Sequence, residues 1–338
     1  MGAPDGGRVR LTELTECGGC AAKWGAALLP ELVGAVGALG VGGNSDLLVG
    51  LGAPDDAAVV RVSDEVALVS TTDFFPPLVD DPADYGAIAA ANACSDVFAM
   101  GGDVLLALNI AAFPESLPTS VIQAIFRAAA EVVAAAGGVV AGGHTIRSPE
   151  PIFGLAVQGV VAPGAQFTKG GARPGDALVL SKPLGTGLAL ASGDADTQAA
   201  AVAIMRQLNR EAAAVLRRHS DSVHAVTDVT GFGLLGHGWE MADRSGAHLV
   251  FDSASLPLID GVLATADQGT RTGGDPRNRD YVRGRVHLQA ADAITAVAFD
   301  PQTSGGLLAA VSPEVVDELA GFVTVGRVVA GPPGVTLR

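Results

Sequence analysis

The sequence predicts a protein of the mixed α/β (α+β) class with two domains. The chain has 338 residues, which is the length of two domains of about 150 residues each. Short runs rich in Val, Ile and Leu are bounded by Gly, Asp or Pro, as buried strands are. Segments with helical periodicity alternate with these runs in both halves. Such alternation favours two domains that each combine a sheet with helices.

The first half of the chain predicts a strand-rich domain over residues 46–163, preceded by a flexible N-terminal segment over residues 1–45. One helix is expected to begin near Asp84 as its N-cap. A second is expected to begin at Thr119 or Ser120 and to stop at Gly137-Gly138. Apolar runs predict strands at residues 47–51, 57–62, 66–70, 104–112 and 152–161.

A second domain is expected over residues 164–338. Residues 164–175 contain Gly, Pro, Lys and Arg but no apolar run, which places the domain boundary there. Residues 267–284, rich in Gly, Arg, Asn and Asp, predict a loop. Beyond the boundary, strands are expected at 177–180, 223–226, 249–251, 307–311 and 323–329, and helices at 199–218, 234–244, 292–299 and 313–319.

The composition excludes several classes of function. The net charge of −15 disfavours binding to nucleic acid or to an anionic membrane, since both require a basic surface. It suits a protein that collects divalent cations, although a solvated acidic surface explains it equally. Three cysteines are too few for a disulfide framework, and the sequence shows neither a signal peptide nor a membrane span. A cytoplasmic enzyme is the expectation.

Aspartates at the ends of apolar runs are the first candidates for chemistry. Carboxylates there often line a cleft, and a few of them together with phosphate oxygens make the usual Mg²⁺ site. Taken singly, each aspartate could equally be an N-cap or a turn residue. The candidates are the pair Asp55-Asp56, Asp73, Asp96 (one helical turn after Asn92) and Asp228.

Glycine-rich turns are the second group of candidates, because the sequence has neither a P-loop nor a G-x-G-x-x-G motif. Gly142-Gly143-His144-Thr145 offers free amides and a hydroxyl, or is an ordinary turn that ends a strand. Residues 231–237 could open a helix whose N-terminal amides receive an anion, or could serve packing alone. The six histidines are scattered, which disfavours a zinc site.

Cys17-Gly-Gly-Cys20 is a C-x-x-C motif, and Lys23 follows three residues later. It could be half of a zinc site, a redox pair, or a single reactive thiolate whose pKa the lysine lowers. Structural cysteines are the fourth interpretation. The residue types alone leave these alternatives open.

Several longer blocks resemble selenophosphate synthetase (selenide, water dikinase), and they occur in the order of that family from about Leu11 to the C-terminus. The blocks are Ser70-Thr-Thr-Asp-Phe-Phe75, Asn92-Ala-Cys-Ser-Asp96, Ala141-Gly-Gly-His-Thr145, residues 149–156, residues 227–237 and residues 300–307. The resemblance implies the two-domain fold of the aminoimidazole-ribonucleotide-synthetase superfamily. It also implies a homodimer in which N-terminal strands form a barrel across the interface.

The implied reaction converts ATP, selenide and water to selenophosphate, AMP and orthophosphate, and supplies activated selenium for selenocysteine and selenouridine. ATP is then a substrate and Mg²⁺ the cofactor, and a selenium-delivery protein is a further candidate partner. Matching by residue, the resemblance assigns catalysis to Cys20 and Lys23 and the metal to Asp56, Asp96 and Asp228. It assigns ATP contacts to Lys23, Ala53, Pro54, Asp55, Asp73, Asp96, Gly143, His144 and Thr145, of which Gly143–Thr145 reach ATP from the partner subunit.

Two positions depart from the family pattern. Ala22 stands where a second cysteine is common, and Cys17 stands where many members have glycine. The role of Cys17 is therefore open. Two other functions are weighed against the synthetase: another ATP-dependent enzyme of the superfamily, such as thiamine-monophosphate kinase, and a non-catalytic scaffold. The Cys20–Lys23 segment argues against the former, and the intact aspartates argue against the latter.

Overall fold

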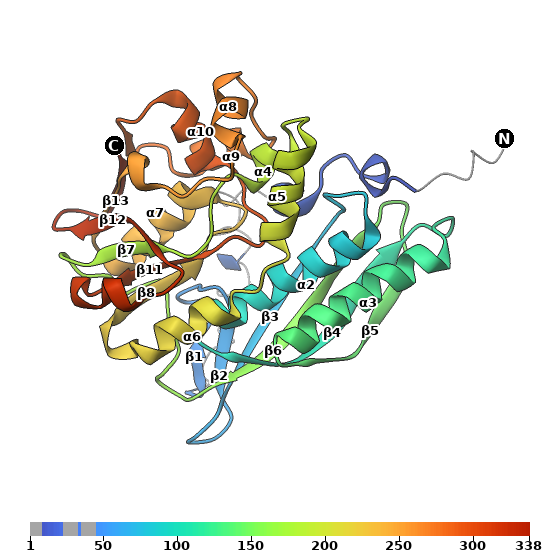
Figure 1. Ribbon diagram of the computed structural model, residues 1–338. Helices are drawn as coiled ribbons and strands as arrows, with labels where there is room; N and C mark the ends of the chain where they lie inside the picture. Colours follow the sequence, from blue (N-terminus) through green and yellow to red (C-terminus); the bar gives the residue numbers. More distant parts are fainter. Residues whose placement is uncertain (1–8, 23–32, 35–44) are drawn as a thin grey trace.

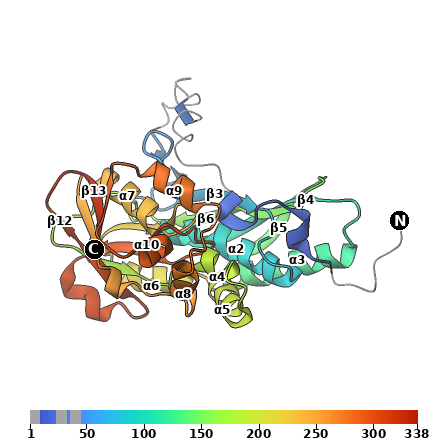
Figure 2. The same cartoon turned by 90° about the horizontal axis from the view of Figure 1, so that it is seen from above.

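The computed structural model describes residues 9–22, 33–34 and 45–338. The chain forms two α/β bodies, each built on one sheet, and they lie side by side in both Figure 1 and Figure 2. Residues 47–161 build a six-stranded sheet, and residues 177–337 build a seven-stranded sheet. This architecture agrees with the predicted mixed α/β class.

The six-stranded sheet has the order β1-β2-β3-β6-β4-β5. Neighbours in it are antiparallel except for β4 and β5, which are parallel and therefore need a crossover, supplied by α3 (Thr119–Ala135). The strands are β1 (Leu47–Val49), β2 (Ala58–Arg61), β3 (Ala67–Phe75), β4 (Asp103–Phe113), β5 (Val139–Arg147) and β6 (Ile152–Val161).

Helix α2 (Pro82–Ala99) is the central packing element. It lies beside α3, packs on β3 and β6, and also contacts β8, α5 and α6 of the other body (Figure 1). Ile88 and Phe98 are fully buried, and each such side chain contributes about 1.5–3 kcal/mol. The helix begins earlier than predicted: Asp81 is its N-cap and accepts hydrogen bonds from the amides of Ala83 and Asp84.

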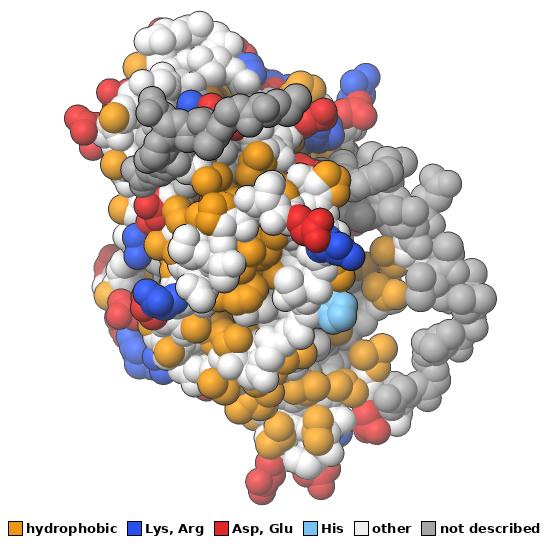
Figure 3. All heavy atoms as spheres, turned by 90° about the vertical axis from the view of Figure 1, so that its right-hand side faces the viewer, with side chains coloured by type: hydrophobic (Ala, Val, Ile, Leu, Met, Phe, Trp, Pro, Cys, Tyr) orange, Lys and Arg blue, Asp and Glu red, His pale blue; other side chains and the backbone are white. Residues whose placement is uncertain are grey.

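The opposite face of the six-stranded sheet carries exposed apolar side chains. In β4, Leu105 and Leu108 expose 49% and 38% of their surface. The register with β6 shifts between Val104 and Leu106, which interrupts the alternation of the strand, so that these two leucines are exposed although they are three residues apart. Phe74 of β3 and Ile146 of β5 are also exposed. Figure 3 views a different side of the molecule, that of α3 and the edge of the sheet at β5, where hydrophobic side chains also gather with few charged ones among them.

The seven-stranded sheet has the order β10-β13-β9-β12-β7-β11-β8. Its strands are β7 (Ala177–Leu180), β8 (Val223–Asp228), β9 (His248–Phe251), β10 (Val286–Leu288), β11 (Leu307–Val311), β12 (Val323–Val329) and β13 (Gly334–Leu337). Its helices are α4 (Thr186–Leu190), α5 (Ala195–Met205), α6 (Arg210–Arg218), α7 (Gly233–Ser245), α8 (Val262–Asp267), α9 (Asp275–Tyr281) and α10 (Asp292–Phe299).

Three expectations for the second half were wrong in detail. The helix expected at 199–218 is two helices, because Asn209 between them donates to Ser95 Oγ and to the Gly305 carbonyl, each at 2.8 Å. The loop expected at 267–284 contains α9, and residues 313–318 form a 3₁₀ helix. The short strands β10 and β13 were not predicted.

Candidate functional site

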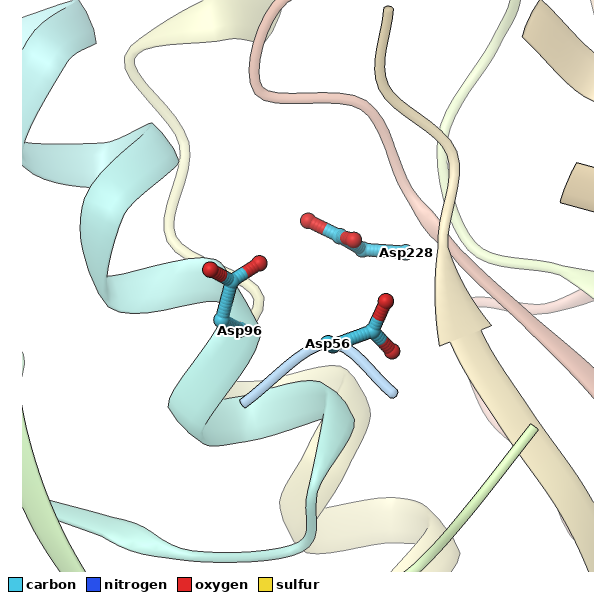
Figure 4. Close-up of side chains that lie close together, drawn as sticks. All are labelled: Asp56, Asp96 and Asp228. Carbon is cyan, nitrogen blue, oxygen red and sulfur yellow. The ribbon is translucent and has the colours of Figure 1, made fainter. Parts of the chain in front are cut away.

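Three aspartates from separate parts of the chain converge on one point. Asp56 lies in the loop before β2, Asp96 on α2, and Asp228 is the last residue of β8. One carboxylate oxygen from each lies within 4.8 Å of the others, and Figure 4 shows the three side chains turned toward one another. The sequence predicted this grouping, which we call the aspartate cluster (Asp56, Asp96 and Asp228).

The carboxylates of the aspartate cluster lie close enough to repel one another, and a bound cation would offset this repulsion. Burial, and then the charge of Asp56, raise the pKa of Asp228 to about 6. One oxygen of Asp56 and one of Asp228 are buried and have no hydrogen-bond partner among the described residues. Buried carboxylate oxygens without donors are costly, and these two, together with the carboxylate of Asp96, match the oxygen ligands that Mg²⁺ prefers. The residues therefore fit a divalent cation.

Hydroxyl groups and one lysine hold the carboxylates in place. Thr71 of β3 donates to Asp96, and Thr227 Oγ1 donates to Asp56 Oδ1 at 3.0 Å. The Lys169 ammonium lies 2.9 Å from the same oxygen of Asp56. Asp56 and Asp96 are thereby held by neighbours from other strands or loops.

Lys169 belongs to a buried group that the sequence did not reveal. Its ammonium also lies 3.0 Å from Glu240 Oε2, which in turn accepts from His237 Nδ1 at 3.1 Å. The boundary segment 164–175 thus supplies a charged group to the site. The one sequence signal was His237, which ends the block at 227–237; nothing in the sequence marked Lys169 or Glu240 as its partners.

Cys20 lies beside the same helix face as Asp96. Its thiol donates to Asn92 Oδ1 at 3.5 Å, and Asn92 is one helical turn before Asp96. Asn92 Nδ2 donates to Asp73 Oδ2, so Asp73 lies beside Cys20 and Asn92, while its role as an ATP contact stays a prediction. Asp73 lies inside β3, however, and does not end the strand, because β3 continues to Phe75.

The segment that carries Cys20 packs tightly against the chain between β3 and α2. The Gly19 amide donates to the Pro76 carbonyl at 2.9 Å, and Gly19 has a φ of +64°. A Cβ added at Gly18 would lie 2.0 Å from the Pro77 carbonyl oxygen. Only glycine therefore allows this approach. Cys20 is 2% exposed as a result.

The three cysteines, all of which lie in the described residues, form no disulfide with one another, and their surroundings differ. Cys17 is exposed, whereas Cys20 and Cys94 are buried. Burial raises the pKa of the Cys94 thiol to about 12, which indicates a structural cysteine. Lys23, the other residue assigned to catalysis, lies outside the described residues.

The remaining predicted nucleotide contacts fall in two places. Ala53 and Pro54 lead directly into Asp55, whose pKa burial and the charge of Asp56 raise to about 6. Gly143, His144 and Thr145 lie on β5, at the opposite end of the sheet from β1. They pair with residues 109–111 of β4, so they continue a strand and do not form the turn considered above. Gly142 and Gly143 adopt φ values of 156° and 150°, which favour glycine. In this chain β4 and β6 lie between β5 and β3.

The fold and the site define a class of two-domain proteins related to AIR synthase. Residues 54–161 match the N-terminal domain of AIR synthase related proteins, and residues 173–332 match the C-terminal domain. Thiamine monophosphate kinase from Aquifex aeolicus has a similar structure, with a TM-score of 0.69 over 97% of this chain and 98% of that chain at 20% identity. Hydrogenase maturation protein HypE in complex with ATP gives a TM-score of 0.59 over 87% of each chain at 17% identity.

Sequence relatives narrow the class to one family. The chain is 44% identical to selenide, water dikinase of Caldanaerobacter subterraneus over 92% of this chain and 91% of the relative. It is 44% identical to that of Myxococcus xanthus, over 96% of each chain, and 46% identical to that of Paraburkholderia xenovorans, over 92% and 89%. The chain belongs to the selenide, water dikinase family.

Proposed function

We propose that this protein is a selenophosphate synthetase, which converts ATP, selenide and water to selenophosphate, AMP and orthophosphate. Membership of the selenide, water dikinase family supports the reaction class. The observation that carries the assignment in this chain is the position of Cys20, one helical turn from the aspartate cluster through Asn92. A thiol beside a metal-ligating carboxylate group suits selenium transfer to a phosphoryl group.

The aspartate cluster holds Mg²⁺ in this proposal. Bound there, Mg²⁺ supplies the positive charge that neutralises the phosphate oxygens during phosphoryl transfer. Asp56, Asp96 and Asp228 provide its protein ligands, and Thr71 and Thr227 keep two of those carboxylates oriented. Further oxygens would come from the nucleotide and from water.

Cys20 and Lys23 act on the reacting groups. Cys20 positions selenide beside the phosphoryl group, with selenium kept at the selenide oxidation level throughout, and its burial excludes water from this nucleophile. Lys23 stabilises phosphate charge as a cation. ATP is bound by Lys23, Ala53, Pro54, Asp55, Asp73 and Asp96, with Gly143, His144 and Thr145 contributed by a partner subunit.

A homodimer is the second part of the proposal. The uncovered face of the six-stranded sheet exposes Phe74, Leu105, Leu108 and Ile146, which a second copy would bury. Strands of two copies would then form a barrel across the interface. That arrangement would bring Gly143–Thr145 of one subunit toward the nucleotide site of the other, which explains their distance from the site within one chain.

We also propose the domain roles expected from the sequence: residues 1–45 carry Cys20 and Lys23, residues 46–163 bind ATP and Mg²⁺, and residues 164–338 form the second domain. The contact between Lys169 and Asp56 supports a shared site between the last two. No helix in the described part of the chain is long and apolar enough to cross a membrane. A cytoplasmic location and a selenium-delivery partner stay predictions.

Phosphorus NMR of the products formed from ATP with and without selenide tests the reaction. A selenophosphate resonance together with AMP, both dependent on selenide, is the expected result. ADP as the only stable nucleotide product would instead indicate another kinase of the superfamily. Binding of ATP without turnover would indicate a non-catalytic member.

A further inference from the structure

Lys169 holds two adjacent aspartates with two different groups. Its backbone amide donates to Asp55 Oδ2 at 3.0 Å, and its ammonium lies 2.9 Å from Asp56 Oδ1. The residue is 8% exposed. A buried ammonium in direct contact with a carboxylate of the aspartate cluster is a permanent positive charge next to the proposed metal position.

Glu240 of α7 holds the ammonium from the other side. Its Oε2 lies 3.0 Å from Lys169 Nζ and accepts from His237 Nδ1, while His237 Nε2 lies 3.2 Å from Thr230 Oγ1. The charge of Lys169 lowers the pKa of Glu240 to about 2, so this carboxylate is ionised at neutral pH. The ammonium is therefore shared by Asp56 and a second carboxylate that the aspartate cluster does not contain.

This arrangement has a consequence for metal binding. A divalent cation that binds Asp56 is repelled by the ammonium on the same carboxylate, at a separation where such charges interact strongly. The phosphate oxygens of a nucleotide add negative charge that offsets this repulsion. We propose that Lys169, held by Glu240, weakens divalent-cation binding to the aspartate cluster when no nucleotide is present, so that the metal enters together with the nucleotide. The inference rests on the proposed function.

Two substitutions should change metal affinity in opposite directions. Lys169→Met keeps a long unbranched side chain but removes the charge, and should tighten Mn²⁺ binding to the nucleotide-free protein by about tenfold. Glu240→Gln removes the second carboxylate and leaves the ammonium to Asp56 alone. It should weaken Mn²⁺ binding by about threefold or more. A purely structural role for Lys169 would not give opposite signs.

The experiment titrates Mn²⁺ into the full-length protein at pH 8 without nucleotide and measures free Mn²⁺ by electron paramagnetic resonance. Lys169→Arg retains the charge and should bind as the wild type does. Arg210→Met is the control for loss of a cation outside the site, because the Arg210 guanidinium donates to the Ala135 carbonyl at 2.8 Å, at the end of α3. Its loss should change Mn²⁺ affinity by less than about twofold.

Thermal melting of the same proteins supplies a second readout. Lys169→Met should melt below the wild type in EDTA and gain more from added Mn²⁺. Unchanged or weaker Mn²⁺ affinity in a folded Lys169→Met protein overturns the inference, as does a shift of both variants in the same direction. If Lys169→Met does not fold, Glu240→Gln decides: unchanged affinity overturns the inference. Absence of Mn²⁺ binding in every variant also overturns the inference. Phosphorus NMR of the wild-type products tests the proposed function separately.

Discussion

At the scale of single residues, the site is organised by charges that lie far apart in the sequence. The Thr227 hydroxyl and Asp56 are 171 residues apart, and Lys169 and Glu240 are 71 residues apart. Each contact fixes a carboxylate whose burial would otherwise favour its neutral form. For Asp228, burial and then the negative charge of Asp56 raise the pKa of the carboxyl group.

Asp96→Asn should abolish selenophosphate formation while leaving the fold intact. Asparagine is nearly the same size but lacks the charge of a metal ligand, so turnover should fall by more than about 100-fold. Turnover and circular dichroism measured on one preparation decide the matter. Asp64→Asn, at an exposed position between β2 and β3, is the matched control. Activity of Asp96→Asn within a few-fold of the wild type would make Asp96 an ordinary helix residue.

Cys20→Ser should remove selenide-dependent product formation, whereas Cys17→Ser should not. Only Cys20 contacts Asn92 beside the aspartate cluster, and Cys17 is exposed. Serine retains a hydroxyl that is almost un-ionised at neutral pH, so the substitution tests thiolate chemistry. Both variants should still bind nucleotide. The two variants are assayed under strong reductant. Equal loss of product formation in both would support a C-x-x-C redox pair instead.

The sequence was sufficient for the aspartate cluster because each aspartate follows an apolar run or sits in a motif of the family. The sequence did not predict the pairing of Lys169 with Glu240, because the two residues meet only where the segment before β7 packs on α7. Asn209 is a similar case: its inward hydrogen bonds to Ser95 and Gly305 break a helix that local propensity would continue.

At the scale of elements, residues 9–22 form a segment that packs on the residues between β3 and α2. Asp80 accepts from the Thr12 amide at 3.0 Å and from the Arg10 guanidinium at 3.1 Å. Hydrogen bonds from Thr12 and Arg10 lower the pKa of Asp80 in spite of its partial burial. The two glycines complete the contact and bring Cys20 to α2. The sequence marked Gly18 and Gly19 only as a flexible stretch, because the carbonyl of Pro77 that requires them lies elsewhere in the chain.

Gly18→Ala should release this segment without unfolding the protein. The added Cβ would lie 2.0 Å from the Pro77 carbonyl oxygen, so the backbone must move apart and expose Cys20. In a Cys17→Ser background, a disulfide reagent should label Cys20 at least about tenfold faster, because local opening of the segment exposes its thiol. Product formation should fall in parallel.

Gly52→Ala provides the control for this substitution, because a Cβ at Gly52 meets nothing within 4 Å. Its labelling rate and activity should match the parent protein. Unchanged labelling in Gly18→Ala would mean that the segment accommodates the methyl group and that glycine is not required for Cys20 burial.

At the scale of the whole molecule, the two bodies share one site but leave one sheet face without cover. Helix α2 contacts both α/β bodies and carries Asp96. The aspartate cluster therefore forms where the two bodies meet. In the described ranges, 9–22, 33–34 and 45–338, α2 and α3 cover one face of the six-stranded sheet and no helix lies over the other. A sheet of this kind usually buries its second apolar face against a partner.

Leu108→Asp should convert the proposed dimer to a monomer. Leu108 lies on β4 between β5 and β6, and 38% of its surface is exposed in the single chain. Burying a leucine contributes about 1.5–3 kcal/mol, and a buried unpaired carboxylate adds a further penalty, so the dissociation constant should rise by more than about 100-fold. Sedimentation equilibrium measures it, with Leu263→Asp on α8 as the matched exposed leucine. Because Gly143–Thr145 are proposed to reach ATP from the partner, the Leu108→Asp monomer should also bind ATP more weakly. A Leu108→Asp protein that remains dimeric would exclude this sheet face as the interface, whatever its activity.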